Sequence, residues 1–218
     1  MAFLTVTIYA QKEVTKFLGI PVDGYKSEMK QKLISKGFVP KKVGNNEFLE
    51  GEFNGTDVNV YICTNNNKVY RIMLCDAYTR SEADIKIRFN KLVSQFMNNK
   101  RYRGSEDYTI PESESIPYEM GYNKKRYEAI FYQLSDNNTV DIDMQKQIQN
   151  EMLKKYTMEQ IENPTEEIKM EMVSMAFKIY GEIIIKKPVW FRICECNGEY
   201  YIAMYYDNEF NQANGEDL

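Results

Sequence analysis

The residues best suited to contact a ligand lie near the C-terminus, where Trp190 and Arg192 precede the dipeptide Asn197-Gly198 and Tyr201 and Tyr205 follow it. This dipeptide supplies the two positive φ angles of a type I′ turn, so a β-hairpin with a two-residue loop is predicted. In that register Trp190 lies beside Tyr205, with Arg192 and Tyr201 on the same face. Trp, Tyr and Arg dominate interface hot spots, and aromatic rings also stack on sugars. Either the hairpin is central and covered on both sides, or this face is a binding surface.

The chain contains no histidine, so it lacks the usual general base at neutral pH and the commonest metal ligand. Ser-His-Asp and Cys-His triads and His-ligated zinc are therefore excluded. An enzyme would have to use other groups, such as the carboxylate pair Asp141 and Asp143. The simpler interpretation of that pair is the polar start of a helix. No residue is assigned a catalytic role, and a carboxylate-based hydrolase of glycan or peptide is the alternative function.

Four cysteines could form disulfides or bind metal. Cys194 and Cys196 lie two apart on one strand, while Cys63 and Cys75 are separated along their hairpin by roughly six residue steps, about 20 Å. Neither spacing suits a local disulfide, although a bridge between lobes stays open. Cys-x-Cys without a second pair is not a zinc pattern, and Asp207–Gln212 resembles a calcium loop but lacks its glycine. We expect buried free thiols, with no metal and no cofactor.

The elements that must position these residues begin with an α+β lobe over residues 12–103. A short strand over 15–20 precedes a helix with Ser27 as N-cap and Gly37 as C-terminal stop. A second helix opens at the capping box Ser81-Glu82-Ala83-Asp84 and runs to about Met97. Its inward residues are Ile85, Phe89, Leu92, Val93 and Phe96.

Between these helices the pattern predicts an antiparallel meander. Asn54-Gly55 favours a type I′ hairpin in which Leu49 faces Val60. A three-residue turn at 65–67 then leads to a strand over 68–76, in which Arg71 faces Tyr61. The lobe is therefore read as a helix-flanked meander of order β-α-β-β-β-α, which does not by itself fix a function.

Residues 104–117 are polar and acidic and predict a connection to a second α+β lobe over 118–218. This lobe contains a strand over 127–134, an amphipathic helix with an apolar residue every four positions from Met144 to Tyr156, and the C-terminal hairpin. Between these lies a helix with Asn163 as N-cap and Pro164 at N1. Its apolar stripe comprises Ile168, Met172, Met175, Ala176, Ile179 and Ile183. A methionine-rich stripe could line a binding groove, but core packing is favoured.

Composition limits the classes of partner. The 218 residues are 43% hydrophobic with a net charge of −4, which suits one large or two small folded domains and not a nucleic-acid-binding surface. No apolar run is long enough to span a membrane once a leader is removed.

The N-terminus is typical of the end of a secretory signal peptide. An apolar run over 2–9 leads to Ala10-Gln11, a small-residue cleavage site, so residues 1–11 are read as a signal-peptide remnant. The basic n-region is missing, which leaves two explanations: the true start lies upstream, or the run is a first β-strand. We expect an exported or periplasmic protein.

Several segments carry a resemblance: Phe17–Gly24, Lys36-Gly37-Phe38, Thr64–Ile72, and the ending from Tyr205–Glu209 to Asn214–Leu218. Together they resemble a family of hypothetical exported proteins of anaerobic gut bacteria. The resemblance implies a cleaved leader and a periplasmic or surface location. It supplies no activity and no catalytic residues.

These observations favour an exported, non-enzymatic binding module for a protein or glycan partner in the cell envelope. Its predicted binding residues are Trp190, Arg192, Tyr201 and Tyr205. A flat or apolar exposed patch would support binding, whereas a concave acidic pocket with two facing carboxylates would support the hydrolase.

Overall fold

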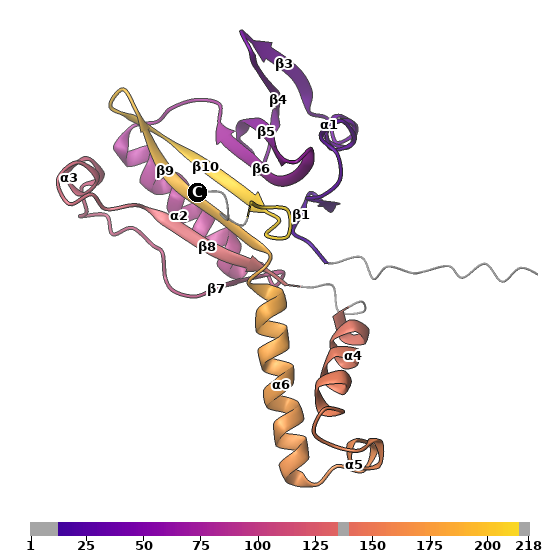
Figure 1. Ribbon diagram of the computed structural model, residues 1–218. Coiled ribbons are helices and arrows are strands. Elements are labelled where there is room, and N and C mark those ends of the chain that lie inside the picture. Colours follow the sequence, from indigo (N-terminus) through magenta and orange to yellow (C-terminus); the bar gives the residue numbers. More distant parts are fainter. Residues whose placement is uncertain (1–12, 135–139, 214–218) are drawn as a thin grey trace, which may run out of the picture. The chain divides into compact units, whose positions relative to one another are not determined.

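The computed structural model describes residues 13–134 and 140–213, excepting the side chains of 140–144. The chain divides into a sheet unit, Val14–Leu134 with Ile184–Leu218, and a helical unit that contains Ser135–Ile183. The expected leader at 1–11 lies outside the described residues. Helices and a large antiparallel sheet confirm the predicted α+β class (Figure 1).

The sheet unit is built on an eight-stranded sheet of order β3-β4-β5-β6-β10-β9-β8-β7, in which all neighbours are antiparallel. The strands are β3 Val39–Val43, β4 Asn46–Glu52, β5 Asp57–Asn65, β6 Lys68–Asp76, β7 Tyr102–Gly104, β8 Glu128–Gln133, β9 Pro188–Cys196 and β10 Glu199–Asp207. A separate two-stranded sheet joins β1 Lys16–Phe17 to β2 Ile20–Pro21. The single strand predicted over 15–20 is therefore a small hairpin, turned by residues at positive φ.

Three helices belong to the sheet unit: α1 Lys26–Ser35, α2 Glu82–Asn98 and α3 Ile116–Gly121. The other three are α4 Val140–Met152, α5 Met158–Glu162 and α6 Glu166–Ile184. None of the helices described combines the length and the apolar character needed to cross a bilayer.

Both type I′ hairpins have the predicted register. Leu49 pairs with Val60 across a turn whose Asn54 and Gly55 have φ of 52° and 71°. Trp190 pairs with Tyr205 across Asn197-Gly198, where φ is 54° and 81°. A two-residue loop leaves no freedom in the pairing, so both registers follow directly from the sequence.

The turn between β5 and β6 differs from its prediction. Asn65 and Lys68 form the last pair before the turn, which therefore has two residues and not three. A bulge between Cys63 and Thr64 then shifts the register. Arg71 consequently faces Cys63 instead of Tyr61, which faces Met73. The bulge supplies the extra residue that a three-residue turn was expected to provide.

Helix starts were predicted unevenly. Ser81 caps α2 as expected, because its hydroxyl accepts a hydrogen bond from the Asp84 amide at 3.2 Å. Helix α1 instead begins after Tyr25, so Ser27 lies inside it. Helix α6 begins after Thr165, whose hydroxyl accepts from the Ile168 amide, so the predicted cap at Asn163 is wrong. The Thr165 hydroxyl, which directly precedes the first turn of α6, serves as the cap in place of the Asn163 side chain.

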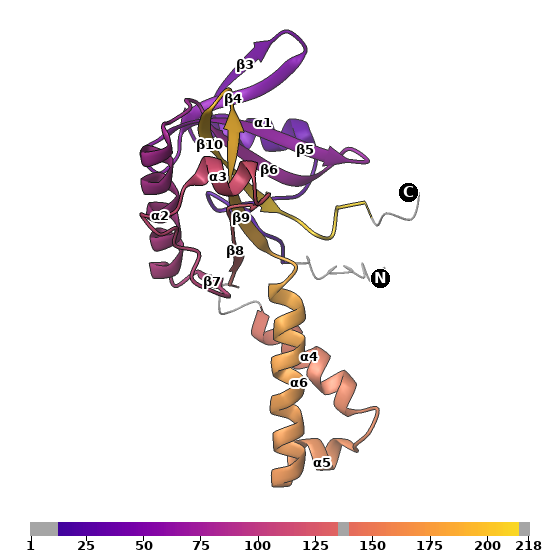
Figure 2. The ribbon, with the colours of Figure 1, turned by 90° about the vertical axis from the view of Figure 1, so that its left-hand side faces the viewer.

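Helices α1 and α2 pack on one face of the sheet, which holds the main core. Met29 and Leu33 of α1 and the predicted inward residues of α2 join the same apolar cluster as alternate residues of the strands. Phe191, fully buried, contacts Phe89 of α2 with ring centroids 5.1 Å apart. Figure 2 shows α2 lying along this side of the strands.

The predicted division at 104–117 is not found in the structure. Strands from both sides of that segment share one sheet, since β6 pairs with β10. The compact units separate instead around 135–183, a helical insertion between the paired strands β8 and β9. The segment 104–117 was misread because its polar composition suits a surface loop as well as a linker.

The helical unit has its own small core. It joins Ile148 and Met152 of α4 to the apolar stripe predicted for α6. Packing of that stripe is therefore confirmed within this unit, with Tyr156 and Ile161 at its margin.

Candidate functional site

The sheet face opposite α1 and α2, which we call the open face, carries the predicted site. In the described part of the sheet unit no helix packs on it, and Figure 1 shows β8, β9 and β10 in front of α2. Register places one residue from each of six neighbouring strands in a line, which we call the aromatic row: Phe48, Tyr61, Met73, Tyr205, Trp190 and Ile130. The adjacent line, the polar row, comprises Glu50, Asn59, Cys75, Ala203, Arg192 and Glu128.

The structure brings Trp190 and Tyr205 into direct contact. Their rings stack with centroids 4.0 Å apart, and the indole N–H of Trp190 donates to Asp207 at 2.8 Å. Trp190 is half-buried, whereas Tyr205 is only 5% exposed. The pair is thus a rigid platform of which mainly Trp190 reaches the surface.

Two residues at this platform, Arg71 and Asp207, were not predicted to belong to the site. Arg71 donates to both carboxylate oxygens of Asp207, at 2.6 and 2.8 Å, and its guanidinium lies 4.8 Å from the Tyr205 ring centre. The bidentate pair raises the pKa of Arg71. No sequence signal links Arg71 to Asp207, because they meet only through the β6–β10 pairing.

Arg192 stands apart from this network. Its guanidinium lies 5.9 Å from the Tyr205 ring centre, but its buried Nε has no hydrogen-bond partner. Arg80 has a similarly unsatisfied Nε, yet Asp76 lies 3.5 Å from it. Within the described residues, no carboxylate forms an ion pair with Arg192. The open face therefore holds one arginine tied to an acid and one without.

Cysteine and tyrosine side chains fill the rest of this face, and burial raises the pKa of two of them. Burial, together with nearby Cys194, raises the pKa of the Cys75 thiol to about 11. Burial and Cys194 also raise the pKa of Tyr201 to about 12. Cys63, Cys75 and Cys194 are half-buried free thiols, but Cys196 is exposed, contrary to the expectation that all four are buried. The raised pKa keeps the Cys75 thiol protonated at neutral pH, and a protonated thiol is a poor nucleophile.

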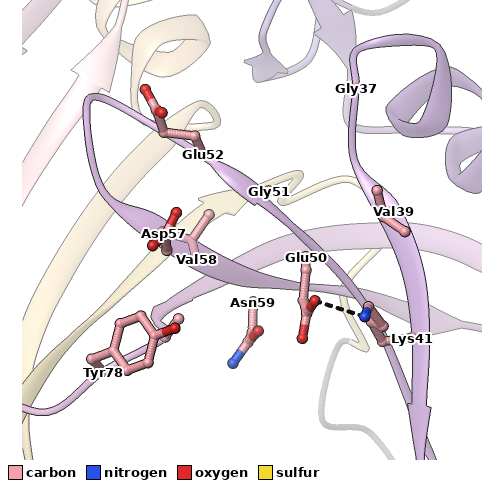
Figure 3. Close-up of a pocket in the computed structure, with 11 residues that line it drawn as sticks. Gly37, Val39, Lys41, Glu50, Gly51, Glu52, Asp57, Val58, Asn59 and Tyr78 are labelled. Atoms are coloured by element: carbon pink, nitrogen blue, oxygen red, sulfur yellow. Dashed lines mark ion pairs between the residues drawn. The ribbon is translucent and has the colours of Figure 1, made fainter.

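A pocket of about 380 Å³ lies at the β3–β4–β5 end of the same face (Figure 3). Its wall includes Glu50, Glu52 and Asp57, but Glu50 forms an ion pair with Lys41 at 3.2 Å. Figure 3 shows Glu52 directed away from Asp57, its cross-strand partner. The pocket is concave and acidic, yet it does not present two facing carboxylates.

Other sequence candidates contribute little to a site. Asp207, the first residue of the calcium-like segment, is engaged by Arg71 and Trp190. The side chains of Asp141 and Asp143 lie outside those described. Among the described side chains, no three Cys, Asp or Glu residues gather in a way that could hold a metal ion.

Comparison with known proteins adds no relative: no family model, no curated protein and no solved structure matches this chain.

Proposed function

We propose that the protein is an exported, non-enzymatic binding module that holds a protein or another cell-envelope component against the open face. The observation that carries this proposal is the aromatic row, which crosses six strands on a face that no described helix of the sheet unit covers. Apolar and aromatic side chains gathered on one exposed face are typical of interaction surfaces. The fixed stack of Trp190 on Tyr205 lowers the entropy cost of binding.

The row also has a suitable size. Six strands spaced about 4.8 Å apart make a strip of about 24 Å, which is comparable to one side of a standard protein interface. Its members are half-buried except for buried Tyr205 and exposed Ile130. A partner would therefore meet a firm surface whose side chains already hold their positions.

A matched pair of variants tests the proposal. Ile130, 37% exposed, ends the aromatic row, whereas Ile87, 66% exposed, lies on α2. Solubilised cell envelope of the native host is passed over the immobilised full-length protein, which should retain one envelope component. Ile130→Asn should reduce the retained amount of that component several-fold. Ile87→Asn should not. Equal retention by both variants would place binding elsewhere.

The hydrolase alternative has weaker support. The pocket beside β3 is acidic, but Lys41 neutralises Glu50 and no pair of opposed carboxylates is formed by Glu52 and Asp57. Glycoside hydrolysis requires two carboxyl groups that flank one bond. Binding is therefore the function we propose.

Export is proposed on the sequence alone, from the apolar run before Lys12 and the resemblance to hypothetical exported proteins. Protein isolated from its native host should begin near Gln11 or Lys12 on N-terminal sequencing. Retention of Ala2 would contradict export by a cleaved leader.

A further inference from the structure

Arg192 offers a hydrogen-bond donor that the protein itself does not use. Its Nε is buried and unpartnered, and no described carboxylate forms an ion pair with it. A buried donor left unsatisfied costs free energy, so such groups normally have a partner. The guanidinium lies beside Cys194 and Tyr205, and a ligand carboxylate on the open face would supply the missing acceptor once the side chain turns its Nε outward.

The surroundings of Arg192 suit a single negative charge. Tyr205 and Cys194 lie beside the guanidinium, and Ala203 and Glu128 are its cross-strand neighbours. The buried Tyr205 ring and the half-buried Cys194 thiol exclude water and strengthen an ion pair. The negative charge of Glu128 opposes a dianion such as phosphate more strongly than a carboxylate, whose two oxygens match the guanidinium fork.

We propose that the segment bound on the open face is a peptide whose Asp or Glu carboxylate pairs with Arg192 while its apolar neighbours contact the aromatic row. This inference rests on the proposed function. A peptide is favoured over an acidic sugar because Trp190 and Tyr205 stack on each other and the Arg71 guanidinium lies over both rings. Little free ring surface is left on which a sugar could stack.

The chain carries its own reporter for the test, since Trp190 is the single tryptophan and lies two residues from Arg192 on the same strand face. The probes are two blocked tripeptides, acetyl-Leu-Asp-Leu-amide and acetyl-Leu-Asn-Leu-amide, titrated into the full-length protein while Trp190 fluorescence is followed. We expect the Asp peptide to bind about tenfold more tightly than the Asn peptide, the discrimination that a charge-assisted hydrogen bond provides.

The variant Arg192→Met should bind both peptides equally, because it removes the charge and keeps an apolar side chain of similar length. Exposed Arg101 is the matched control, and Arg101→Met should keep the preference for Asp. Equal binding of the two peptides by the unmodified protein, or no fluorescence response to either at millimolar concentration, would overturn the inference.

Glu128 provides the second measurement. If the carboxylate site is vacant for a ligand, Glu128→Gln should strengthen binding of the Asp peptide by removing a competing negative charge. A double-mutant cycle that couples Glu128→Gln to Arg192→Met in thermal stability would identify Glu128 as the partner of Arg192 and overturn the inference.

The two proposals fail separately. If Ile130→Asn reduces retention of an envelope component while the peptides bind equally, the binding module stands and the carboxylate inference falls. If the Asp peptide requires Arg192 but no envelope component depends on Ile130, the carboxylate site stands and the proposed function falls.

Discussion

The two faces of the sheet differ in burial and in side-chain chemistry, although neighbouring residues of the same strands form them. On β9, Phe191 is fully buried among the rings of Phe89, Phe96 and Phe131, whereas Trp190 on the opposite face is half-buried. The core face consists mainly of apolar side chains that need shape complementarity, and its buried Asp76 is paired with Arg88 of α2 at 3.0 Å. The open face uses aromatic and charged side chains whose polar tips must be matched one by one. Apolar character on both faces thus serves the core on one face, and on the other it forms the surface on which we propose that a partner binds.

The largest effect on stability is expected when the neighbouring residues Trp190 and Phe191 of β9 are truncated, which tests whether the two faces differ in packing. Phe191→Ala should lower the free energy of unfolding by about 3–5 kcal/mol, because it leaves a large cavity in the core. Trp190→Ala should cost about 2 kcal/mol, from the lost stack on Tyr205 and the lost hydrogen bond to Asp207. Denaturant unfolding measures both values. Equal losses would mean that the open face is packed as tightly as the core.

The next largest effect concerns Arg71. Its ion pair with Asp207 is well shielded, since the acid side chain is 4% and the arginine 25% exposed. Arg71→Met removes the ion-pair partner of that buried carboxylate, which keeps its hydrogen bond from the Trp190 indole, and should cost about 2–3 kcal/mol. Equilibrium unfolding again provides the measurement, with exposed Arg103→Met as the control. A loss no greater than that of the control would show that the pair adds nothing to stability.

The open face should contribute a pH dependence of its own, because the core face lacks its thiols. The pKa of Cys75 is raised from 9.0 to about 11 and that of Tyr201 from 10.0 to about 12, in both cases mainly by burial. The folded state therefore holds these protons to higher pH than the unfolded state. Their contribution to stability is fully present below pH 9 and is lost as pH rises through 11 and 12.

The free energy of unfolding should therefore decrease steadily as pH rises from about 8.5 to about 11.5. The double variant Cys75→Ala, Tyr201→Phe should show a shallower decrease. The same slope in the variant as in the unmodified protein would assign the pH dependence to other groups.

The smallest effect is expected for Arg192. Because its Nε has no acceptor and no described acid forms an ion pair with it, Arg192→Met removes only its contacts with Tyr205 and Cys194 and should change stability by less than about 1 kcal/mol. The contrast with Arg71→Met sharpens the comparison within the open face itself. A loss for Arg192→Met as large as that for Arg71→Met would show that Arg192 has an internal partner.

The sequence predicted those elements whose structure depends on residues close together in the chain, above all the two Asn-Gly hairpins. Asn54-Gly55 and Asn197-Gly198 fix two registers, so the pairing of Trp190 with Tyr205 and the face carrying Arg192 could be predicted from the sequence. Strand β3 was not predicted, because Pro40 and two lysines give it little strand character, although such residues protect a sheet edge.

The remainder depended on contacts between distant segments. The bulge after Cys63 leaves no composition signal, and it decides that Tyr61 joins the aromatic row through Met73. The pairing of β6 with β10 joins residues more than a hundred positions apart, and sequence patterning carries no information about it. For that reason the predicted site comprised three aromatic residues and Arg192, without Arg71 and Asp207, which hold the Trp190–Tyr205 platform in place.

The helical insertion has a consequence for how this chain can change over generations. Its two ends meet at one rung of the sheet, where Tyr132 at the end of β8 pairs with Pro188 at the start of β9. A short turn could close that gap, so the segment between them can be lost, replaced or acquired in a single genetic event without moving either strand. The insertion has an apolar core of its own, so substitutions within it can accumulate while the strands of the open face keep their register.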